Sequence, residues 1–599
     1  MDRRGLLKTA AAVALLAPAW PGFSQAASGA ARRVRPTDIS WPPPAAWAKL
    51  KDAVGGNLVE VHSLFGPCGS EPNGAECRDT TQNIHNPFFI GDQPGGTQVS
   101  GWLDAWTAAP SAYAVAAHGT ADVAAAVDFA RTNNLRLVVK GAGHSYQGTS
   151  NAPDSLLIWL RPMNKVTLHD AFVPQGCAGT APVPAITAEA GAVWIDLYQA
   201  VTIEGGRYVQ GGGCTDVGVA GLVQSGGFGS FSKGFGSAAS HLLEAEIVTA
   251  DGQVRIANAC SNKDLFWALK GGGGGSWGVV TRLTLRTHDL PQNFGAAWGE
   301  LKADTDDAFR ALLARFFDFY AHNLFNAHWG EQVSIGPGNT LKFSLVCQGL
   351  DNDSAHAAWK PFADWVATAP PGIVVGKPLG TIAVPARIWW SVGVNPSLVR
   401  DTRAGAPAHH AWWDGDSGQV GAYLYGYDSL WLPASLLEPA RRKTLTDALF
   451  AASRYKQVGL HLNKGIAGAP AAAVAATRDT ATNPAVAEAF ALVIIADGEG
   501  AAYPGEARPA LDLATARKEA KAIDLAAAEL RKIVPHAGSY VSESNYFNAD
   551  WRQAFWGANY AKLRAVKDKY DPAGLFFGHH GVGSEDWSAD GFTRLAKRS

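Results

Sequence analysis

The chain has 599 residues, a formal net charge of −2 and 47% hydrophobic residues, enough for a large core divided between at least two domains. It contains no basic run and no basic domain, which argues against nucleic-acid binding. The 66 glycines follow no collagen period, and nothing in the composition indicates a coiled coil or a disordered chain.

Residues 1–26 have the pattern of a twin-arginine export signal. Arg3 and Arg4 precede an apolar stretch, and "SQA" at its end is typical of a cleavage site. Lys8 and Pro18 break the apolar stretch, which is also short for a membrane anchor of roughly 20 residues. We therefore expect export to the periplasm or the medium, and no later segment predicts a transmembrane helix.

Residues 27–106 are rich in Pro, Gly and Asn, and we interpret them as an N-terminal extension rather than a domain. In an oxidising compartment some of the six cysteines should pair, and Cys68 with Cys77, nine residues apart, is the expected local disulfide. No CxxC pattern occurs, so no metal site is predicted. His409, His410, His579 and His580 form adjacent pairs without ligand spacing, and we interpret them as structural.

Residues 107–290 predict a mixture of strands and helices. The stretch 111–145 is typical of a strand, a helix and a second strand, and short strands and helices follow without regular alternation. The sequence pattern changes near residue 291, where we expect a second domain that continues to residue 537. Strands, helices and clustered tryptophans characterise this part. Residues 538–599 predict a tail with a helix that returns to the first domain. The fold class is therefore α+β.

Three glycine-rich loops lie at residues 141–150, 211–236 and 271–280, each beside a β-branched run. Loops without Cβ atoms let backbone N–H groups converge on an anion, and a diphosphate is the usual guest. The first loop, "GAGHSYQGTS", contains His144. His144 could be a structural loop histidine that is hydrogen-bonded to a neighbour.

The known motifs of other phosphate-binding or catalytic loops match these three loops poorly. The first loop does not open a helix and lacks the acidic residue of a dinucleotide-binding fold, and no P-loop sequence occurs. Gly274 to Gly278 contain GxSxG, but a helix precedes and a strand follows, the reverse of a hydrolase elbow.

Five stretches together resemble the berberine bridge enzyme-like FAD-linked oxidases of the vanillyl-alcohol-oxidase fold. They are "VVKGAGHSYQG", "YVQGGGCTDVGVAGLVQSGGFGSFSKGFG", "EAEIVTADGQV", "DLFWALKGGGGGSWGVVTRLTL" and "FWGANYAKLRAVKDKYDPAGLFF". Their order is the order found in that family. The resemblance implies a two-part FAD-binding domain and a substrate domain with an antiparallel sheet and helices.

The resemblance also implies that FAD is bound bicovalently, through His144 at the 8α-methyl group and Cys214 at C6. Such tethers go with a raised flavin potential. The other residues expected to hold the cofactor are Gly141, Ala142, Gly143, Ser145, Tyr146, Gly148, Val217, Gly218, Gly221, Gly226, Gly227, Gly229 and Val280. Cys214 could instead pair in a disulfide, because the chain has "CTDVG" where relatives often carry a proline after the cysteine.

Two departures from the family pattern put cofactor contacts in doubt. Trp159 stands where the family usually has an aspartate, and Ser240 with His241 stands where an Asp-Asn pair is common. In plant members a valine at the position of Val217 admits oxygen, which favours an oxidase over a dehydrogenase.

The stretch "GSYVSESNYFNADW" resembles the last active-site strand of the family, which supplies the catalytic base. Glu543 is the expected base, supported by Tyr540 or Tyr546. Strand alternation would put Tyr540 and Glu543 on opposite faces, so the pair requires a bulge. Glu543 could otherwise be a solvated glutamate of an edge strand.

We therefore expect a flavin oxidase that oxidises an alcohol carbon of a sugar, an aromatic compound or a secondary metabolite and reduces O₂ to peroxide. The alternatives are a dehydrogenase that uses a quinone or cytochrome, and a flavin-binding protein without activity. Aromatic side chains of the second domain could stack on substrate rings, although such clusters are often simply core. The sequence does not indicate an oligomeric state.

Overall fold

The structure is a computed structural model that describes residues 32–596. The predicted export signal at residues 1–26 lies outside the described residues. Between residues 32 and 596, no helix is both long enough and apolar enough for a bilayer crossing.

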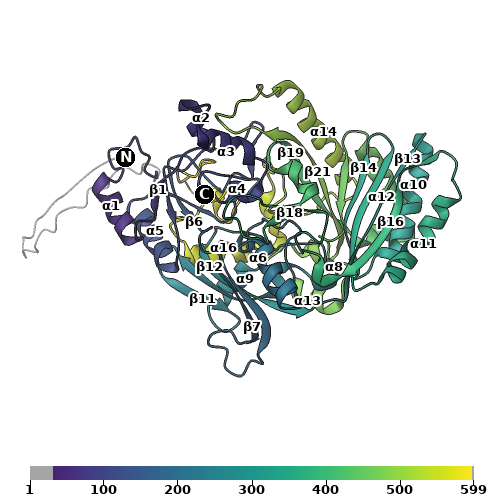
Figure 1. The fold of residues 1–599 in the computed structure, drawn as a ribbon, viewed down its shortest axis with the longest axis horizontal. Helices are drawn as coiled ribbons and strands as arrows, with labels where there is room; N and C mark the ends of the chain where they lie inside the picture. Colours follow the sequence, from purple (N-terminus) through teal and green to yellow (C-terminus); the bar gives the residue numbers. More distant parts are fainter. Residues whose placement is uncertain (1–31, 597–599) are drawn as a thin grey trace, which may run out of the picture.

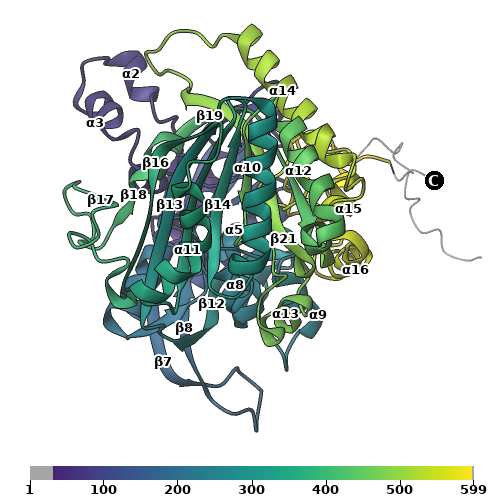
Figure 2. The same ribbon diagram turned by 90° about the vertical axis from the view of Figure 1, so that its right-hand side faces the viewer.

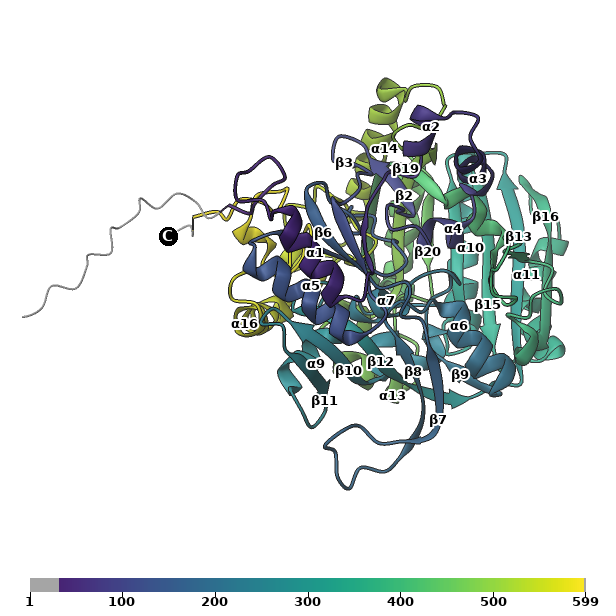
Figure 3. The same ribbon diagram turned by 60° about the vertical axis from the view of Figure 1, so that its left-hand side comes forward.

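A four-stranded sheet forms the first layer of the N-terminal half (Figures 1 and 3). Its strands, in spatial order, are β1 (Leu58–Glu60), β4 (Tyr113–Ala116), β6 (Ser155–Trp159) and β5 (Arg136–Lys140). The predicted strand-helix-strand unit is present as β4, α5 (Thr120–Thr132) and β5, but β6 lies between the two strands and pairs parallel with both. Val123, Ala126, Val127 and Ala130 form the buried face of α5 at helical spacing.

A second, antiparallel sheet follows in the same half (Figure 3). Its order is β11 (Val254–Asn258), β10 (Leu242–Thr249), β12 (Gly278–Asp289), β8 (Val183–Glu189) and β7 (Val166–Phe172), with β9 (Arg207–Val209) paired to β12. Short helices connect these strands: α6 (Trp194–Tyr198), α7 (Val219–Gln224), α8 (Ser232–Phe235) and α9 (Lys263–Leu269).

A nine-stranded sheet dominates the other half (Figure 2). Its order is β16 (Ile373–Pro385), β13 (Asn293–Ala303), β15 (Thr340–Gln348), β14 (Trp329–Gly336), β20 (Val458–His461), β21 (Ala489–Ala501), β19 (Gly421–Pro433), β2 (Val99–Trp102) and β3 (Trp106–Thr107). The helices that pack on it are α10 (Asp306–Phe319), α11 (Asn352–Ala367), α12 (Pro439–Ser453) and α14 (Leu513–Arg531). The observed mixture of sheets and helices confirms the α+β class.

Alternation along β21 separates the two faces of this sheet. Val493 and Ile495 belong to the core beneath the helices, whereas Ile494 and Ala496 line a cavity on the opposite face. Because successive side chains of a strand point to opposite faces, one sheet builds both the core and a cavity wall.

The N-terminal extension joins both halves. It begins with α1 (Pro44–Ala53), β1 pairs with β4, and β2 pairs parallel with β19. The expected disulfide between Cys68 and Cys77 is present and links α2 (Gly66–Ser70) to α3 (Ala75–Asn83), while α4 (Pro87–Gly91) follows. A second disulfide, between Cys177 and Cys260, was not predicted.

The C-terminal tail lies against the third glycine-rich loop. The predicted helix is divided at Gly557 (φ 53°) into α15 (Trp551–Trp556) and α16 (Tyr560–Tyr570). Trp556 Nε1 donates to Gly271 O at 3.1 Å, and Lys567 Nζ donates to Ser276 O at 2.6 Å. The tail is therefore packed on the N-terminal half.

Candidate active site

A cavity of about 860 Å³ lies between the two halves. The three glycine-rich loops form one side, and β14, β19, β20 and β21 form the other. This volume lies in the upper part of the range of 300–1,000 Å³ that small-molecule and cofactor sites occupy.

The first glycine-rich loop is fixed at its start by a buried lysine. Lys140 Nζ donates to the carbonyls of Gln93, Pro94 and Gly96 at 2.8, 2.6 and 2.8 Å, and burial lowers its pKa to about 7. Gly143 (φ 87°) then turns the backbone and requires glycine. The chain emerges with His144 on the cavity wall, one-quarter exposed.

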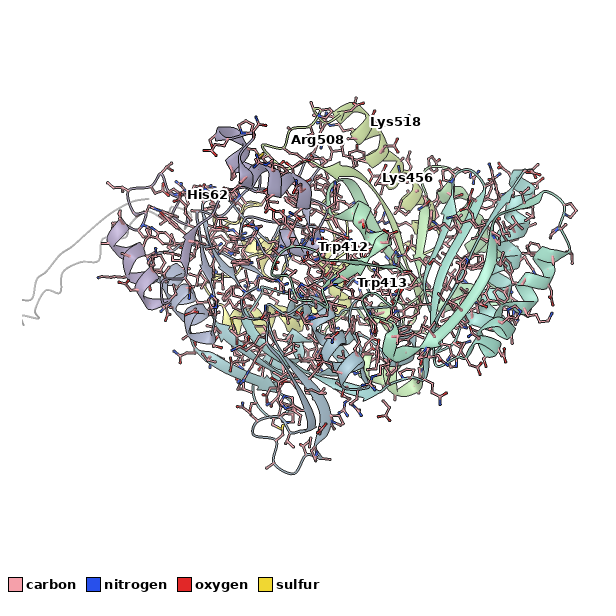
Figure 4. The ribbon with its side chains drawn as sticks, viewed as in Figure 1. His62, Trp412, Trp413, Lys456, Arg508 and Lys518 are labelled. Carbon is pink, nitrogen blue, oxygen red and sulfur yellow. A yellow bond between two sulfur atoms is a disulfide. The ribbon has the colours of Figure 1, made fainter. Side chains whose placement is uncertain are left out.

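The second loop presents Cys214 to the cavity as a free thiol. Trp413 Nε1 donates to Gly213 O at 2.9 Å, and Thr215 Oγ1 donates to Ala411 O at 2.6 Å. The strand β18 (Ala411–Trp413) therefore covers the loop, and Figure 4 shows Trp412 and Trp413 in the middle of the molecule. The disulfide alternative for Cys214 has no support in the structure.

The third loop connects α9 to β12, so the helix-before-strand order is present and the hydrolase alternative is rejected. Gly273 (φ 94°) and Gly275 (φ 68°) take left-handed conformations. A Cβ at Gly275 would meet no atom within 4 Å, so the loop leaves open space above its backbone.

Most of the predicted site residues line this cavity. They are His144, Cys214, Gly141, Ala142, Gly143, Ser145, Tyr146, Val217, Gly218, Gly221, Gly229, Val280, Tyr540 and Glu543. Gly148, Gly226, Gly227 and Tyr546 lie off the cavity wall. Gly148 is packed against the Trp106 ring, and the ring of Tyr546 stacks on His579 with centroids 3.8 Å apart.

Tyr540 and Glu543 reach the cavity through a tight turn, and the predicted strand is absent. Glu543 N donates to Tyr540 O at 3.0 Å, which closes a four-residue turn. The expectation of a strand was wrong here, and with it the expected separation of the two side chains onto opposite faces. A turn brings its first and last residues together, so no bulge is needed.

Glu543 forms an ion pair with Lys464, a residue that the sequence analysis missed. Lys464 follows β20, and both side chains line the cavity. Burial, and then the charge of Glu543, raise the pKa of the Tyr540 phenol, so that this hydroxyl stays protonated at neutral pH. The wall therefore offers a carboxylate beside an ammonium and a phenolic donor.

Three further carboxyl groups in the cavity were also missed: Asp216, Glu331 and Asp416. Burial, and then the charge of Asp216, raise the pKa of Asp416 to about 6. Burial, with the charges of Asp416 and Asp216, raises the pKa of the Cys214 thiol. The three carboxyl groups come from three separate segments of the chain, so no sequence spacing could have grouped them with one another.

The two departures from the family pattern lie away from the cavity wall. Trp159 ends β6, and Ser240 Oγ donates to Ser237 O at 2.6 Å. His241 Nε2 bonds to Phe235 O at 2.9 Å. Ser240 and His241 thus form local hydrogen bonds, whereas Trp159 Nε1 has no hydrogen-bond partner among the described residues.

The adjacent histidines His409 and His410 converge on a carboxylate that their spacing did not reveal. Their Nε2 atoms lie 2.9 and 3.1 Å from Asp196 Oδ1. These three side chains place one carboxylate oxygen and two imidazole nitrogens within 4.8 Å of one another, a grouping that could hold a metal ion. The two hydrogen bonds also join α6 to the segment before β18.

Comparisons with known sequences identify the class. The profile described as "FAD binding domain" matches residues 110–258, and "Berberine and berberine like" matches residues 524–583. FAD-linked oxidoreductase malF of Malbranchea aurantiaca is 30% identical over 597 residues, covering 94% of each chain. VAO-type flavoprotein oxidase VAO615 of Thermothelomyces thermophilus is 28% identical over 606 residues, covering 94% of this chain and 95% of the relative.

Comparison with solved structures identifies the same class of protein. The VAO-type flavoprotein MtVAO615 from Myceliophthora thermophila C1 superimposes with a TM-score of 0.76 at 25% identity, covering 94% of this chain and all of that one. Glucooligosaccharide oxidase from Acremonium strictum, described with a 6-S-cysteinyl, 8α-N1-histidyl FAD, gives a TM-score of 0.61 at 19% identity over 83% of this chain and 95% of that one. The chain belongs to the berberine bridge enzyme-like FAD-linked oxidoreductases of the VAO type, and it is an enzyme of that family.

The residues present fit FAD. Glycines in left-handed conformations line the cavity, among them Gly143 and Gly275, and a Cβ at Gly275 would meet no atom within 4 Å. A free thiol and an accessible imidazole lie on the same wall, which is the donor set that two covalent tethers need.

Proposed function

We propose that the protein is a flavin oxidase that removes a hydride from an alcohol carbon of a sugar, an aromatic compound or a secondary metabolite, and reduces O₂ to hydrogen peroxide. The observation that carries this proposal is the convergence of His144, Cys214 and the Tyr540–Glu543 turn on one cavity. The carbohydrate oxidase among the structural neighbours supports a sugar as one candidate.

FAD, when bound, supplies the hydride acceptor and passes the electrons to the final oxidant. We propose that His144 and Cys214 both bond to it. Asp416 lies near the Cys214 thiol, whose pKa is raised by burial and then by the Asp416 charge, and Asp416 is ionised at neutral pH, since its own pKa is about 6. It can therefore take the thiol proton when the sulfur forms its bond.

Glu543 is the proposed base for the substrate hydroxyl. A base must lie within hydrogen-bond reach of the proton that it takes, and Glu543 is on the cavity wall with its carboxylate held by Lys464. Tyr540, kept protonated, can donate a hydrogen bond to the substrate oxygen. Val217 also lines the cavity, which supports oxygen access and hence an oxidase.

Export from the cytoplasm is also proposed. The twin-arginine pattern at residues 1–26 and the two disulfides, Cys68–Cys77 and Cys177–Cys260, support it, since disulfides persist in oxidising compartments.

The cofactor linkage has a direct test. The purified protein should keep a yellow chromophore on the polypeptide after acid denaturation. The variants His144→Ala and Cys214→Ala should each keep one tether, and the double variant should release all of the flavin. A colourless precipitate from the parent protein would reject the linkage.

The reaction is tested by screening polyols, oligosaccharides and phenolic alcohols for oxygen consumption with peroxide release. Substrates that bleach the flavin without air, and whose electrons pass to a quinone much faster than to O₂, would instead identify a dehydrogenase.

A further inference from the structure

A short hydrogen bond in the cavity, between His144 and Asp216, joins two of the glycine-rich loops. His144 Nε2 lies 2.6 Å from Asp216 Oδ2, and the Asp216 side chain is only 5% exposed. We infer that Asp216 selects Nδ1 of His144 as the atom that bonds to the flavin and accepts the Nε2 proton as that bond forms. This inference rests on the proposed histidyl linkage and assigns a positioning residue to it.

The hydrogen bond to Asp216 fixes which ring nitrogen of His144 carries no proton. An ionised carboxylate only accepts hydrogen bonds, so the imidazole nitrogen that faces it carries the proton. The other nitrogen of a neutral imidazole then holds the lone pair. Between residues 32 and 596, no side chain or backbone group forms a hydrogen bond with His144 Nδ1. The unprotonated nitrogen is therefore the unengaged one.

The acidic partner also makes that nitrogen a better nucleophile. A carboxylate that holds the N–H of an imidazole fixes the tautomer and stabilises the positive charge that develops when the opposite nitrogen reacts. In this cavity the carboxylate and the ring come from different loops, 72 residues apart. The contact therefore exists only in the folded chain.

Asp416 is the other carboxyl group that could serve His144, but the hydrogen bond of the His144 ring goes to Asp216, and Asp416 lies near Cys214. Glu331 lies on β14, and its carboxyl is close to Ser230 and to Asn463 Nδ2, 3.4 Å away. Each tether thus has its own carboxyl group, Asp216 beside the imidazole and Asp416 beside the thiol. Because Asp216 follows Cys214 by two residues, one loop supplies both a tether and the partner of the other tether.

A bond forms between Nδ1 and the 8α carbon of the flavin, and one C–H bond of that methyl group breaks. The flavin ring keeps the two electrons of this C–H bond and is reduced. The Nε2 proton passes to Asp216. This proton and the proton from the methyl group then go to the reduced ring or to the solvent. Dioxygen then takes up two electrons and two protons as hydrogen peroxide and restores the oxidised flavin.

The test compares the parent with Asp216→Asn, Asp216→Ala and Asp216→Glu, and uses Asp416→Asn as the matched control in the same cavity. Proteins are denatured in acid and digested, and mass spectrometry measures the flavin on the peptides that contain His144 and Cys214. We expect Asp216→Asn and Asp216→Ala to lower flavin on the His144 peptide at least tenfold while the Cys214 peptide stays modified. Asp216→Glu should restore part of the histidyl linkage, and Asp416→Asn should keep it.

The outcomes separate this inference from the proposed function. A parent protein with histidyl flavin and an Asp216→Asn variant with the same amount would overturn the role of Asp216 alone. An equal loss in Asp416→Asn would overturn it too, because cavity charge rather than the contact would then be responsible. A parent without flavin on His144 would overturn the proposed linkage, and the role of Asp216 with it.

A second measurement does not depend on the folding of any variant. NMR of the histidyl flavin isolated from exhaustively digested parent protein locates the alkylated nitrogen. We expect Nδ1, and a bond on Nε2 would overturn the inference.

Discussion

The chemistry of the site depends on a few side chains whose partners come from distant parts of the chain. Glu543 meets Lys464, 79 residues away, and His144 meets Asp216. In each pair a carboxylate is held by a partner that fixes its position, which is what a base or an orienting group requires. The buried phenol of Tyr540 stays protonated beside them, because burial and the Glu543 charge both oppose its ionisation.

Replacing the proposed base tests this arrangement at the residue scale. Glu543→Gln keeps the shape of the side chain but cannot take a proton, so flavin reduction by substrate should slow by roughly 10²-fold or more. The amount of bound flavin should stay the same. Rapid-mixing absorbance under anaerobic conditions measures the rate, and Glu488→Gln, at an exposed carboxylate, serves as the control. Unchanged reduction in Glu543→Gln would move the role of base to another residue.

At the scale of elements, buried lysines tie the glycine-rich loops to the rest of the fold. Lys140 ends β5 and holds the turn 93–96 against the first loop. Lys233 in α8 donates to Ala467 O at 2.6 Å and to Phe490 O at 3.1 Å, and so holds the segment that follows Lys464. These contacts supply the donors that loop carbonyls need once they are removed from water.

Removing one such tie should loosen its loop. Lys140→Met leaves three carbonyls without their donor, one of them buried and two partly buried. The free energy of unfolding is expected to fall by about 2 kcal/mol or more. Chemical denaturation monitored by tryptophan fluorescence measures the change. Lys518→Met, on the exposed surface of α14 (Figure 4), provides the matched control and should be neutral. Equal stability of Lys140→Met and the parent would show that the three contacts contribute nothing.

At the scale of the whole molecule, buried and half-buried neutral histidines link stability to pH. Burial lowers the pKa of His241 to about 3, of His288 to about 4 and of His580 to about 3. An unfolded histidine titrates near 6.5. Between pH 6.5 and these lowered values the unfolded chain therefore binds more protons than the folded chain, and stability is lost as the pH falls.

We expect the unfolding temperature to fall as the pH is lowered from 6.5 to 4.5. His580→Asn should make this dependence shallower, because it removes one titrating group and because asparagine tolerates the left-handed backbone at this position (φ 55°). Differential scanning calorimetry at fixed ionic strength measures both proteins. A constant unfolding temperature over this range, or the same slope in the two proteins, would contradict the argument.

Several elements could be predicted from sequence because their signals are local. The helix α5 follows from apolar spacing, the disulfide Cys68–Cys77 from two nearby cysteines, and the order helix, loop, strand around Gly274 from the pattern on each side. The turn at Tyr540–Glu543 was mistaken for a strand because this stretch resembles the last active-site strand of the family, whereas pairing partners decide whether a strand forms.

The sequence by itself determined the glycine-rich loops, the family and the proposed tether residues His144 and Cys214, since these lie in continuous motifs. Only the tertiary structure decided that Lys464 meets Glu543, that Asp216 holds His144, and that Asp196 lies between His409 and His410. The physical reason is that charge and hydrogen-bond partners are chosen by distance in space. The packing of two sheets around one cavity sets those distances, and no spacing along the chain encodes them directly.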